Sequence, residues 1–302
     1  MMNTTVSPLT TVRALESLVA GARTYSLAQS ELGVDLNRVE AKFILPLEVA
    51  TQLCQRLAEK MPCLCVNHKR VLSYRTDYLD TPAFDFFHQH QQKRPRRIKV
   101  RLRHYLDTQS CYLEIKQKDK AGITHKFRRQ LSTAFQPPQT SSVQIHWQEH
   151  ADFVTANTGF SEGSLSPSLR VDYQRICFKD PVLGERVSFD FGVAFHSLPH
   201  DQDHENDHFH TQPSRTWCVQ DRVIVELKVP NHVHLSYGFN CLKEAGLRET
   251  SVSKYCVGLA ALCPDQVKYN GFKPALLKLG LSPAQIGVPY ERVKTPVGTQ
   301  PC

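Results

Sequence analysis

Basic side chains at every second position are the residues of this 302-residue chain whose type and spacing point most clearly to chemistry. Lys99, Arg101 and Arg103 alternate with apolar neighbours, and Lys116 and Lys118 repeat the pattern a few residues later. Successive side chains of a β-strand point to opposite faces, so each segment would present its cations on one face only. Guanidinium and ammonium groups are common donors to phosphate oxygens. The pattern therefore indicates an anion-binding surface suited to phosphate chemistry.

The same alternation continues through the other segments of this kind, and the sign of the charge is mostly positive. Same-parity positions hold twelve cations and four acids, namely Arg38, Lys42, Lys99, Arg101, Arg103, Lys116, Lys118, Lys126, Arg128, Arg175, Arg186 and Lys228 against Glu40, Glu114, Asp190 and Glu226. A solvated charged face is ordinary for an antiparallel sheet and accounts for any single strand. Like charges opposite one another destabilise a sheet, however, so the repetition of one sign across strands favours a site that holds an anion.

If such a sheet closes into a barrel, these cations meet around one lumen. Two unit charges 4 Å apart interact by roughly 4 kcal/mol at an effective dielectric constant of 20, so the cations would repel one another unless an anion lies between them. A polyanion with closely spaced charges meets that need. The few carboxylates of the same face are then candidate ligands of Mg²⁺ or Mn²⁺, which would bridge carboxylate and phosphate oxygens.

Alternation with period two is the dominant pattern and predicts strands at residues 38–43, 74–79, 98–105, 113–118, 126–128, 173–175, 186–190 and 222–229. Apolar spacing predicts a helix over residues 46–60, with Pro46 suited to the first turn. Further helices are expected at 240–247 and 253–262. The expected fold class is α+β, with an antiparallel sheet of many strands and helices packed outside it.

The composition restricts the partners and the compartment. The formal net charge of +8 favours anionic partners such as phosphates, nucleic acid or an acidic membrane surface. No run of about 18 apolar residues occurs, so no membrane span is expected. The ten cysteines form no Cys-x-x-Cys pair and are interpreted as reduced, mostly buried thiols of a cytoplasmic protein.

Changes in composition along the chain suggest three regions. Residues 1–35 are expected to be a loose N-terminal extension, residues 36–264 a single domain, and residues 265–302 a C-terminal tail. Two stretches inside the domain, 133–142 and 196–213, are interpreted as surface loops. The second is rich in histidine; metal binding there is an alternative to a solvated insertion.

Nine segments occur in the order in which they are found in VTC-domain proteins, a family of the CYTH-like triphosphate tunnel metalloenzyme superfamily, and the chain resembles that family over residues 36–264. The segments are 38–43, 74–81, 99–105, 113–118, 126–129, 169–178, 185–190, 223–228 and 253–258. The resemblance implies an antiparallel β-barrel tunnel lined with basic residues. It also implies a polyphosphate polymerase, which transfers the γ-phosphoryl group of ATP to a growing inorganic polyphosphate chain.

Matching this sequence to the family pattern gives a set of expected site residues. The catalytic group is Lys42, Arg101, Arg103, Arg175, Arg186 and Glu226; the phosphate- or nucleotide-binding group is Lys99, Lys116, Lys118, Lys126, Arg128, Tyr173, Lys228 and Lys254. Glu226, with Glu40 and Glu114, is the expected ligand set for Mn²⁺ or Mg²⁺. The usual first strand of the superfamily reads Glu-x-Glu-x-Lys, whereas this chain has Arg38 at the first position. One metal carboxylate is therefore missing, which favours the polymerase-like branch.

Several alternatives remain open at this point. Related proteins of the superfamily hydrolyse inorganic triphosphate or use ATP as adenylate cyclases, and a non-catalytic polyphosphate binder would carry the same basic face. Glu114 and Lys116 are alternatively an internal ion pair, and Tyr173 a packed aromatic residue. Nucleic acid is not expected as a partner, because only Tyr105 and Tyr173 are assigned to the basic face and base stacking needs interleaved aromatic residues.

Overall fold

A computed structural model describes residues 8–31, 38–131, 150–198, 215–230, 236–282 and 285 of the chain. The stretch expected to form a loop at 133–142 lies outside the described residues, as does all of the histidine-rich stretch beyond Leu198.

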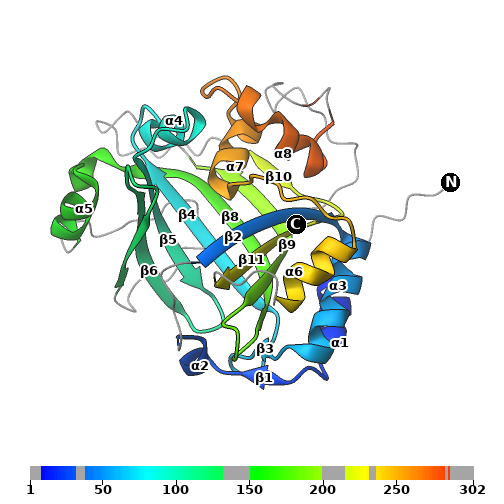
Figure 1. The fold of residues 1–302 in the computed structure, drawn as a ribbon. Coiled ribbons are helices and arrows are strands. Elements are labelled where there is room, and N and C mark those ends of the chain that lie inside the picture. Colours follow the sequence, from blue (N-terminus) through cyan, green and yellow to red (C-terminus); the bar gives the residue numbers. More distant parts are fainter. Residues whose placement is uncertain are drawn as a thin grey trace.

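One curled sheet dominates the structure and encloses an interior space (Figure 1). Its strands follow the order β2 (Arg38–Pro46), β11 (Arg222–Pro230), β9 (Arg186–Ser197), β8 (Ser166–Lys179), β4 (Leu72–Asp80), β5 (Arg97–Tyr105), β6 (Ser110–Lys118) and β7 (Thr124–Gln130). Every pairing along this path is antiparallel. The short strands β3 (Cys63–Leu64) and β10 (Thr216–Cys218) add to it, and β1 (Thr24–Tyr25) pairs with β3 in parallel.

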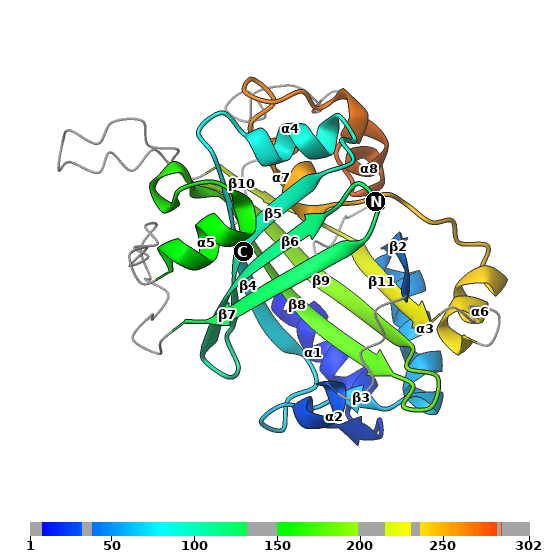
Figure 2. The same cartoon turned by 60° about the vertical axis from the view of Figure 1, so that its left-hand side comes forward.

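The predicted α+β class with an antiparallel sheet is confirmed, but the sheet is curled rather than closed. Within the described residues, β2 and β7 end the strand order and do not pair with each other. Figure 2 shows β6 and β7 on one side of the interior and β8, β9 and β11 on the other. Among the described strands the sheet is therefore curled without closing, and the Thr250 amide donates a hydrogen bond to Lys42 O of the end strand β2 at 2.7 Å.

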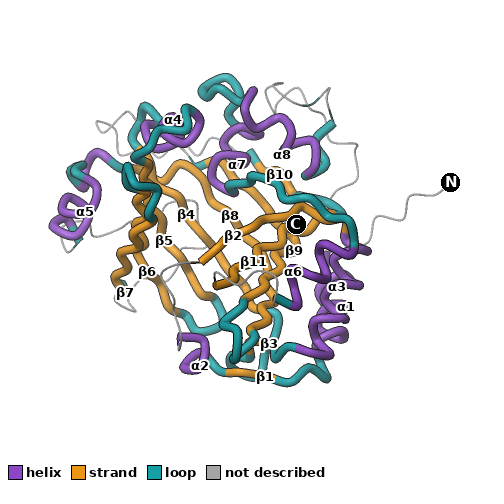
Figure 3. Tube along the Cα trace, in the orientation of Figure 1, coloured by secondary structure: helices purple, strands orange, loops and turns teal. Residues whose placement is uncertain are grey.

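Apolar residues on the outer face of the sheet pack against helices, which lie around the sheet and at its ends (Figure 3). Helix α3 (Leu47–Lys60) confirms the prediction for 46–60, because Ala50, Leu53, Cys54 and Leu57 recur at helical spacing and are buried. Val225 and Leu227 of β11 belong to the same apolar cluster. Burial on the outer side leaves the opposite face of each strand free to line the interior.

The two other predicted helices are present with shifted bounds. Helix α6 (Tyr237–Glu244) begins three residues before the prediction, at the N-cap Ser236. Helix α7 (Lys254–Leu262) follows the N-cap Ser253, whose hydroxyl accepts a hydrogen bond from the Cys256 amide. Four short helices were not predicted, namely α2 (Leu27–Glu31), α4 (Asp85–Gln91), α5 (Ala151–Thr158) and α8 (Lys273–Lys278).

The terminal regions pack more closely than the sequence suggested. Helix α1 (Pro8–Val19), which lies in the region expected to be a loose extension, buries Leu15 and Val19 in the cluster beside α3. In the region expected to be a tail, Leu276 of α8 and Leu279 join the core around α7. Apolar side chains spaced three or four apart account for the packing of both helices, because each helix gains stability only by burying that stripe.

The expectation for the cysteines holds in part. Eight described cysteines are free thiols, seven of them buried, whereas Cys218 of β10 is disulfide-bonded. No helix among the described residues is both long enough and apolar enough to cross a bilayer.

Candidate functional site

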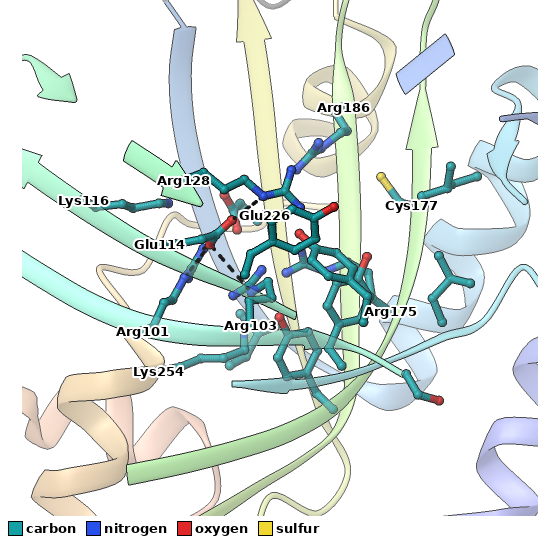
Figure 4. A pocket seen from close by; sticks show the side chains of 18 of the residues that line it. Arg101, Arg103, Glu114, Lys116, Arg128, Arg175, Cys177, Arg186, Glu226 and Lys254 are labelled. Atoms are coloured by element: carbon teal, nitrogen blue, oxygen red, sulfur yellow. Dashed lines mark hydrogen bonds and ion pairs between the residues drawn. The ribbon is translucent and has the colours of Figure 1, made fainter. Parts of the chain in front are cut away.

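A cavity of about 670 Å³ lies inside the curled sheet. It is lined by side chains from strands on both walls and by Ser253 and Lys254, where α7 begins (Figure 4). All of the expected site residues line it except Lys118, which stands at the end of β6 opposite Arg97 and Thr124. The side chain of Arg38 lies outside the described residues.

Glu114 in the middle of β6 is surrounded by four cations from β5 and β7 (Figure 4). Arg101 Nε and Nη2 donate to Glu114 Oε2 at 2.8 and 2.6 Å, and Lys126 Nζ lies 2.9 Å from Oε1. Arg128 Nε is 3.6 Å and Arg103 Nε 4.0 Å from the same carboxylate. The strand register produces this arrangement, because Glu114 pairs with Arg101 on one side and with Arg128 on the other.

The electrostatics of this cluster follow from burial and charge. Burial alone would raise the pKa of Glu114, but Arg101, Arg103 and Lys126 outweigh it and hold that pKa far below its usual range. Glu114 is therefore a permanent anion whose ion-pair partners are the neighbouring strands' cations, and Lys116 is not one of them among the described residues. This single carboxylate orients four cations, and the net charge of the cluster stays strongly positive.

Asp190 of β9 holds a second pair of cations from behind the cavity wall. Arg175 Nε and Nη2 donate to its two oxygens at 2.6 and 2.8 Å, and Lys254 Nζ donates to Oδ2. Asp190 is fully buried; the two cations overcome the effect of burial and lower its pKa. The sequence placed Asp190 among the few carboxylates of the cationic face but did not include it in the expected metal-ligand set of Glu226, Glu40 and Glu114. Its contact with Lys254 ties the start of α7 to the sheet.

Glu40, Lys42, Glu226 and Lys228 form a balanced patch on the opposite wall, where β2 pairs with β11. Lys42 Nζ lies 2.5 Å from Glu40, and Lys228 Nζ lies 2.8 Å from Glu226 and 3.8 Å from Glu40. Glu226 faces Lys42 across the register, and Lys228 faces Glu40. Burial opposes ionisation of Glu226, yet Lys228 and Lys42 hold its pKa well below the usual value.

Lys99 and Lys116 carry the least compensated charge. Neither lies within 4.0 Å of a described carboxylate, although Lys99 Nζ donates to Ser253 Oγ at 3.0 Å. The pKa of Lys116 is depressed well below its usual value by Arg101, burial and Lys228, and that of Lys99 is lowered mainly by burial. An anion placed beside these ammonium groups would offset the repulsion at Lys116 and would favour the charged form of both lysines.

Tyrosines are the lining residues that the sequence reasoning missed. Tyr74, Tyr78 and Tyr112 line the cavity together with the expected Tyr105 and Tyr173. Tyr74 stacks on Tyr173 with ring centroids 5.3 Å apart, and Arg128 Cζ lies 3.5 Å from the Tyr112 centroid. Tyr74 and Tyr78 occupy alternate positions of the predicted strand 74–79, so the alternation could have identified them. Tyr112 precedes the predicted start of its strand. The cavity is therefore more aromatic than the two tyrosines on which the expectation against nucleic acid rested.

The carboxylates differ in their fitness for a metal ion. No group of three or more histidine, cysteine, aspartate or glutamate residues converges within the described part of the chain. Glu114 is enclosed by cations, whose ion pairs already occupy its carboxylate, and its expected metal role stays a prediction. Glu226 and Glu40 are hard oxygen donors that share Lys228 as a neighbour, and they fit a Mg²⁺ or Mn²⁺ ion that takes its remaining ligands from phosphate and water.

The histidine-rich stretch is described only at its beginning. His196 lies in β9, where Nδ1 is 2.9 Å from Thr216 Oγ1 and Nε2 is 3.6 Å from Asp172. The expected alternative of metal binding there involves His196 together with His200, His204, His208 and His210, and these last four lie outside the described residues.

Comparisons with known proteins give structural neighbours of low sequence identity and one family model. A putative adenylate cyclase from Bacillus halodurans is 13% identical, with 72% of this chain and 94% of that chain covered at a TM-score of 0.43. A putative adenylyl cyclase from Hippeastrum, described as having a dominant triphosphatase activity, is 16% identical, with 73% and 94% covered and a TM-score of 0.43. No curated protein matches the chain. The VTC domain model matches residues 37–263, well over half of the sequence, and the chain therefore belongs to the VTC-domain family.

Proposed function

We propose that this protein is a polyphosphate polymerase, which transfers the γ-phosphoryl group of ATP to the end of an inorganic polyphosphate chain inside the cavity. Membership of the VTC-domain family supports an enzyme that acts on triphosphate or polyphosphate. The choice of ATP as donor and the growth of a chain are the finer parts of the proposal.

The observation that carries the proposal is the convergence of cations from separate strands on one cavity. Arg101, Arg103, Lys126 and Arg128 gather around a single acid, and Lys99 and Lys116 add charge without a carboxylate partner among the described residues. Phosphoryl transfer depends mainly on positioning and on neutralising charge, so such a site suits it. No protein nucleophile is needed.

The carboxylates orient the arginines without using all of their donors. A guanidinium has five N–H donors, and the contacts of Arg101 with Glu114 and of Arg175 with Asp190 engage only the Nε and Nη2 atoms. The Nη1 groups stay available to phosphate oxygens. Because each side chain is already fixed, less rotamer freedom is lost when the phosphate binds.

The reaction itself can be written with the chain's own residues as binding groups. A terminal oxygen of the polyphosphate chain attacks the γ-phosphorus, a new P–O bond forms, the bond to the β-phosphate oxygen breaks, and ADP leaves. Arg101, Arg103, Arg175 and Arg186 hold the nucleotide phosphates, and the lysines hold the growing chain. A divalent cation held by Glu226 and Glu40 would neutralise charge on the transferred phosphoryl group.

The deciding experiment incubates the pure protein with ATP and either Mn²⁺ or Mg²⁺ and resolves the products on a gel. We expect long polyphosphate from the wild type and little or none from Arg103→Ala and Glu226→Gln. Arg56→Ala is the matched control, because Arg56 pairs with Glu244 at 2.8 Å on the exposed outer surface. Release of orthophosphate without a polymer would mean a hydrolase, and binding without any product would mean a polyphosphate-binding protein. Either result refutes the polymerase.

A second measurement tests the anion site apart from catalysis. A ligand that binds only the folded state at 100 times its dissociation constant adds about 2.7 kcal/mol to the free energy of unfolding. Inorganic triphosphate should therefore raise the melting temperature, and more so at low salt, where cations are screened less. A melting temperature unchanged by triphosphate would contradict the proposed occupant of the cavity.

A further inference from the structure

The wall of the cavity changes its chemistry toward the turn that joins β5 and β6. The part of this wall built by β4, β5, β6 and that turn presents rings and hydroxyls, and none of its described lining residues is a cation: Tyr74, Tyr105, Tyr112, Ser73, Thr108 and Ser110. Asp107 of the turn also lines the cavity; its carboxylate pairs with Lys69 Nζ at 2.8 Å and accepts a hydrogen bond from the Ser73 amide at 2.6 Å. Leu64 of β3, Val66 and Leu27 of α2 add aliphatic surface to the cavity. We call Tyr74, Tyr105, Tyr112, Ser73, Thr108 and Ser110 the hairpin end.

Contacts between segments show that these residues lie together. The Leu106 amide donates to Ser73 O at 3.1 Å, and Asn67 Nδ2, one residue after Val66, donates to Asp107 O at 2.8 Å. The Tyr105 ring lies 5.2 Å from that of Tyr74 and 5.7 Å from that of Tyr112. Tyr105 and Tyr112 are only half-buried, so part of each ring faces the cavity.

The hairpin end borders directly on the phosphate-binding cations. Arg128 Cζ lies 3.5 Å from the Tyr112 ring centroid, and Arg103 Cζ lies 5.8 Å from that of Tyr74. On the opposite wall, Arg186 lies near Cys177 and Tyr25, and both side chains raise its pKa. A ligand that spans this border would present an uncharged part to the rings and an anionic part to the arginines.

Two buried polar atoms at this border have no hydrogen-bond partner among the described residues. Tyr173 is 3% exposed and lines the cavity, yet its hydroxyl makes no hydrogen bond, and Arg103 Nε is likewise unsatisfied although its residue is 8% exposed. Buried polar groups are rarely left without a partner, because the lost hydrogen bonds with water cost about 1–3 kcal/mol. These atoms are suitable donors to a ligand that lies between the hairpin end and the arginine cluster.

We propose that the hairpin end binds the nucleoside of the phosphate donor, with the base against Tyr105 and Tyr112 and the polar groups of base or sugar near Thr108 and Ser110. A bare polyphosphate gains nothing from a wall without cations, whereas a flat heteroaromatic ring with a polar edge matches rings, hydroxyls and aliphatic surface. The cavity volume lies in the range that encloses a ligand of nucleotide size. The inference deepens the proposed function and rests on it.

This placement fixes the direction of the donor. The nucleoside at the hairpin end puts the triphosphate along Arg103, Arg128 and Arg101, and leaves the side near Lys99 and α7 for the polyphosphate chain. Lys99 belongs to that side because it donates to Ser253 at the start of α7.

The test compares ATP with inorganic triphosphate in calorimetric titrations of the wild type, Tyr105→Ala, Tyr112→Ala and the conservative variant Tyr105→Phe. Loss of a stacking ring weakens base binding by 1–3 kcal/mol, so each alanine variant should lose on the order of tenfold in ATP affinity. Triphosphate affinity should change less than twofold, and Tyr105→Phe should keep both affinities. Melting curves confirm that each variant is folded.

Different failures have different meanings in this design. An equal loss of ATP and triphosphate affinity in both alanine variants would overturn the nucleoside site, because the rings would then serve only to hold Arg128 and Arg103. Unchanged ATP affinity in both variants would overturn it as well. A wild type that binds neither ligand would refute the proposed function itself, and a wild type that binds triphosphate but gains nothing from the nucleoside would refute only this inference. If one alanine variant does not fold, the other decides.

Discussion

Replacement of Glu114 by glutamine tests the electrostatic design of the cavity most directly. Glutamine keeps the shape and one carbonyl oxygen of the side chain but removes its charge. Arg101, Arg103, Lys126 and Arg128 then face one another without the anion that lies 2.6–4.0 Å from them. The four cations then repel one another, and a bound polyphosphate would relieve this repulsion.

The size of the effect follows from the burial of Glu114, whose side chain is 1% exposed. Removing one member of a buried, hydrogen-bonded ion pair costs about 3–5 kcal/mol. For a chain of this size each 1 kcal/mol corresponds to roughly 2 °C, so Glu114→Gln should lower the melting temperature by about 6–10 °C. Saturating triphosphate should recover more of the melting temperature in the variant than it adds to the wild type.

The pH dependence of the same variant gives an independent check. The folded pKa of Glu114 is lowered, so its stabilising effect is complete above the usual glutamate value of 4.5 and is lost as the pH falls toward the folded value. The difference in melting temperature between the wild type and Glu114→Gln should therefore be constant from pH 8 to about pH 5. Below that pH it should shrink.

The assay is a set of melting curves with and without triphosphate, and Glu59→Gln on the exposed side of α3 is the matched control. Equal melting temperatures for Glu114→Gln and Glu59→Gln would refute the reasoning, since a buried acid among four cations cannot be neutral in effect. A triphosphate-induced shift no larger in the variant than in the wild type would contradict the claim that a phosphorylated ligand takes over the compensation.

Two further predictions concern the surroundings of the cavity. Gly258→Ala should destabilise the protein by about 1–3 kcal/mol and weaken triphosphate binding, because an added Cβ would lie 2.6 Å from Leu169 and Phe195 and push α7 outward. Gly271→Ala is the control: its added Cβ meets nothing within 4 Å, so stability and triphosphate binding should both stay unchanged. The pKa of His90 is lowered to about 2 by burial, Lys99 and Arg97, so the unfolded chain binds its proton first as the pH falls below 6.5. In urea titrations from pH 6 to pH 4, His90→Gln should lose stability less steeply than the wild type, by up to about 1.4 kcal/mol per pH unit.

The strands and the direction of their side chains could be predicted from the sequence because both depend on neighbouring residues. Alternation in segments such as 98–105 fixes which residues share a face, and the same cations line the cavity in the structure. Lys118 keeps the parity but stands at the end of β6, beyond the cavity. The alternation therefore predicts which face of the sheet a side chain lies on, but not whether its position along the strand is level with the cavity.

The partners of the charged groups could not be predicted, because they depend on the register between strands that are far apart in the sequence. Arg175 and Asp190 meet across β8 and β9, and Lys254 joins them from a helix 64 residues beyond Asp190. The strand of Glu114 by itself gives no sign of its ion-pair partners. The cations of β5 and β7 that surround it become visible only once both neighbouring strands are placed.

The distribution of charge between the two walls determines how a polyanion would lie. On the wall of β5, β6 and β7, four cations surround the single acid Glu114, whereas on β2 and β11 two lysines balance Glu40 and Glu226. A phosphate chain therefore gains most along the first wall, and a divalent cation gains most at the second, where two carboxylates are close together. A transferred phosphoryl group between the walls would meet arginine on one side and the cation on the other. This arrangement does not require a closed barrel, because the two walls of the curled sheet already differ in charge.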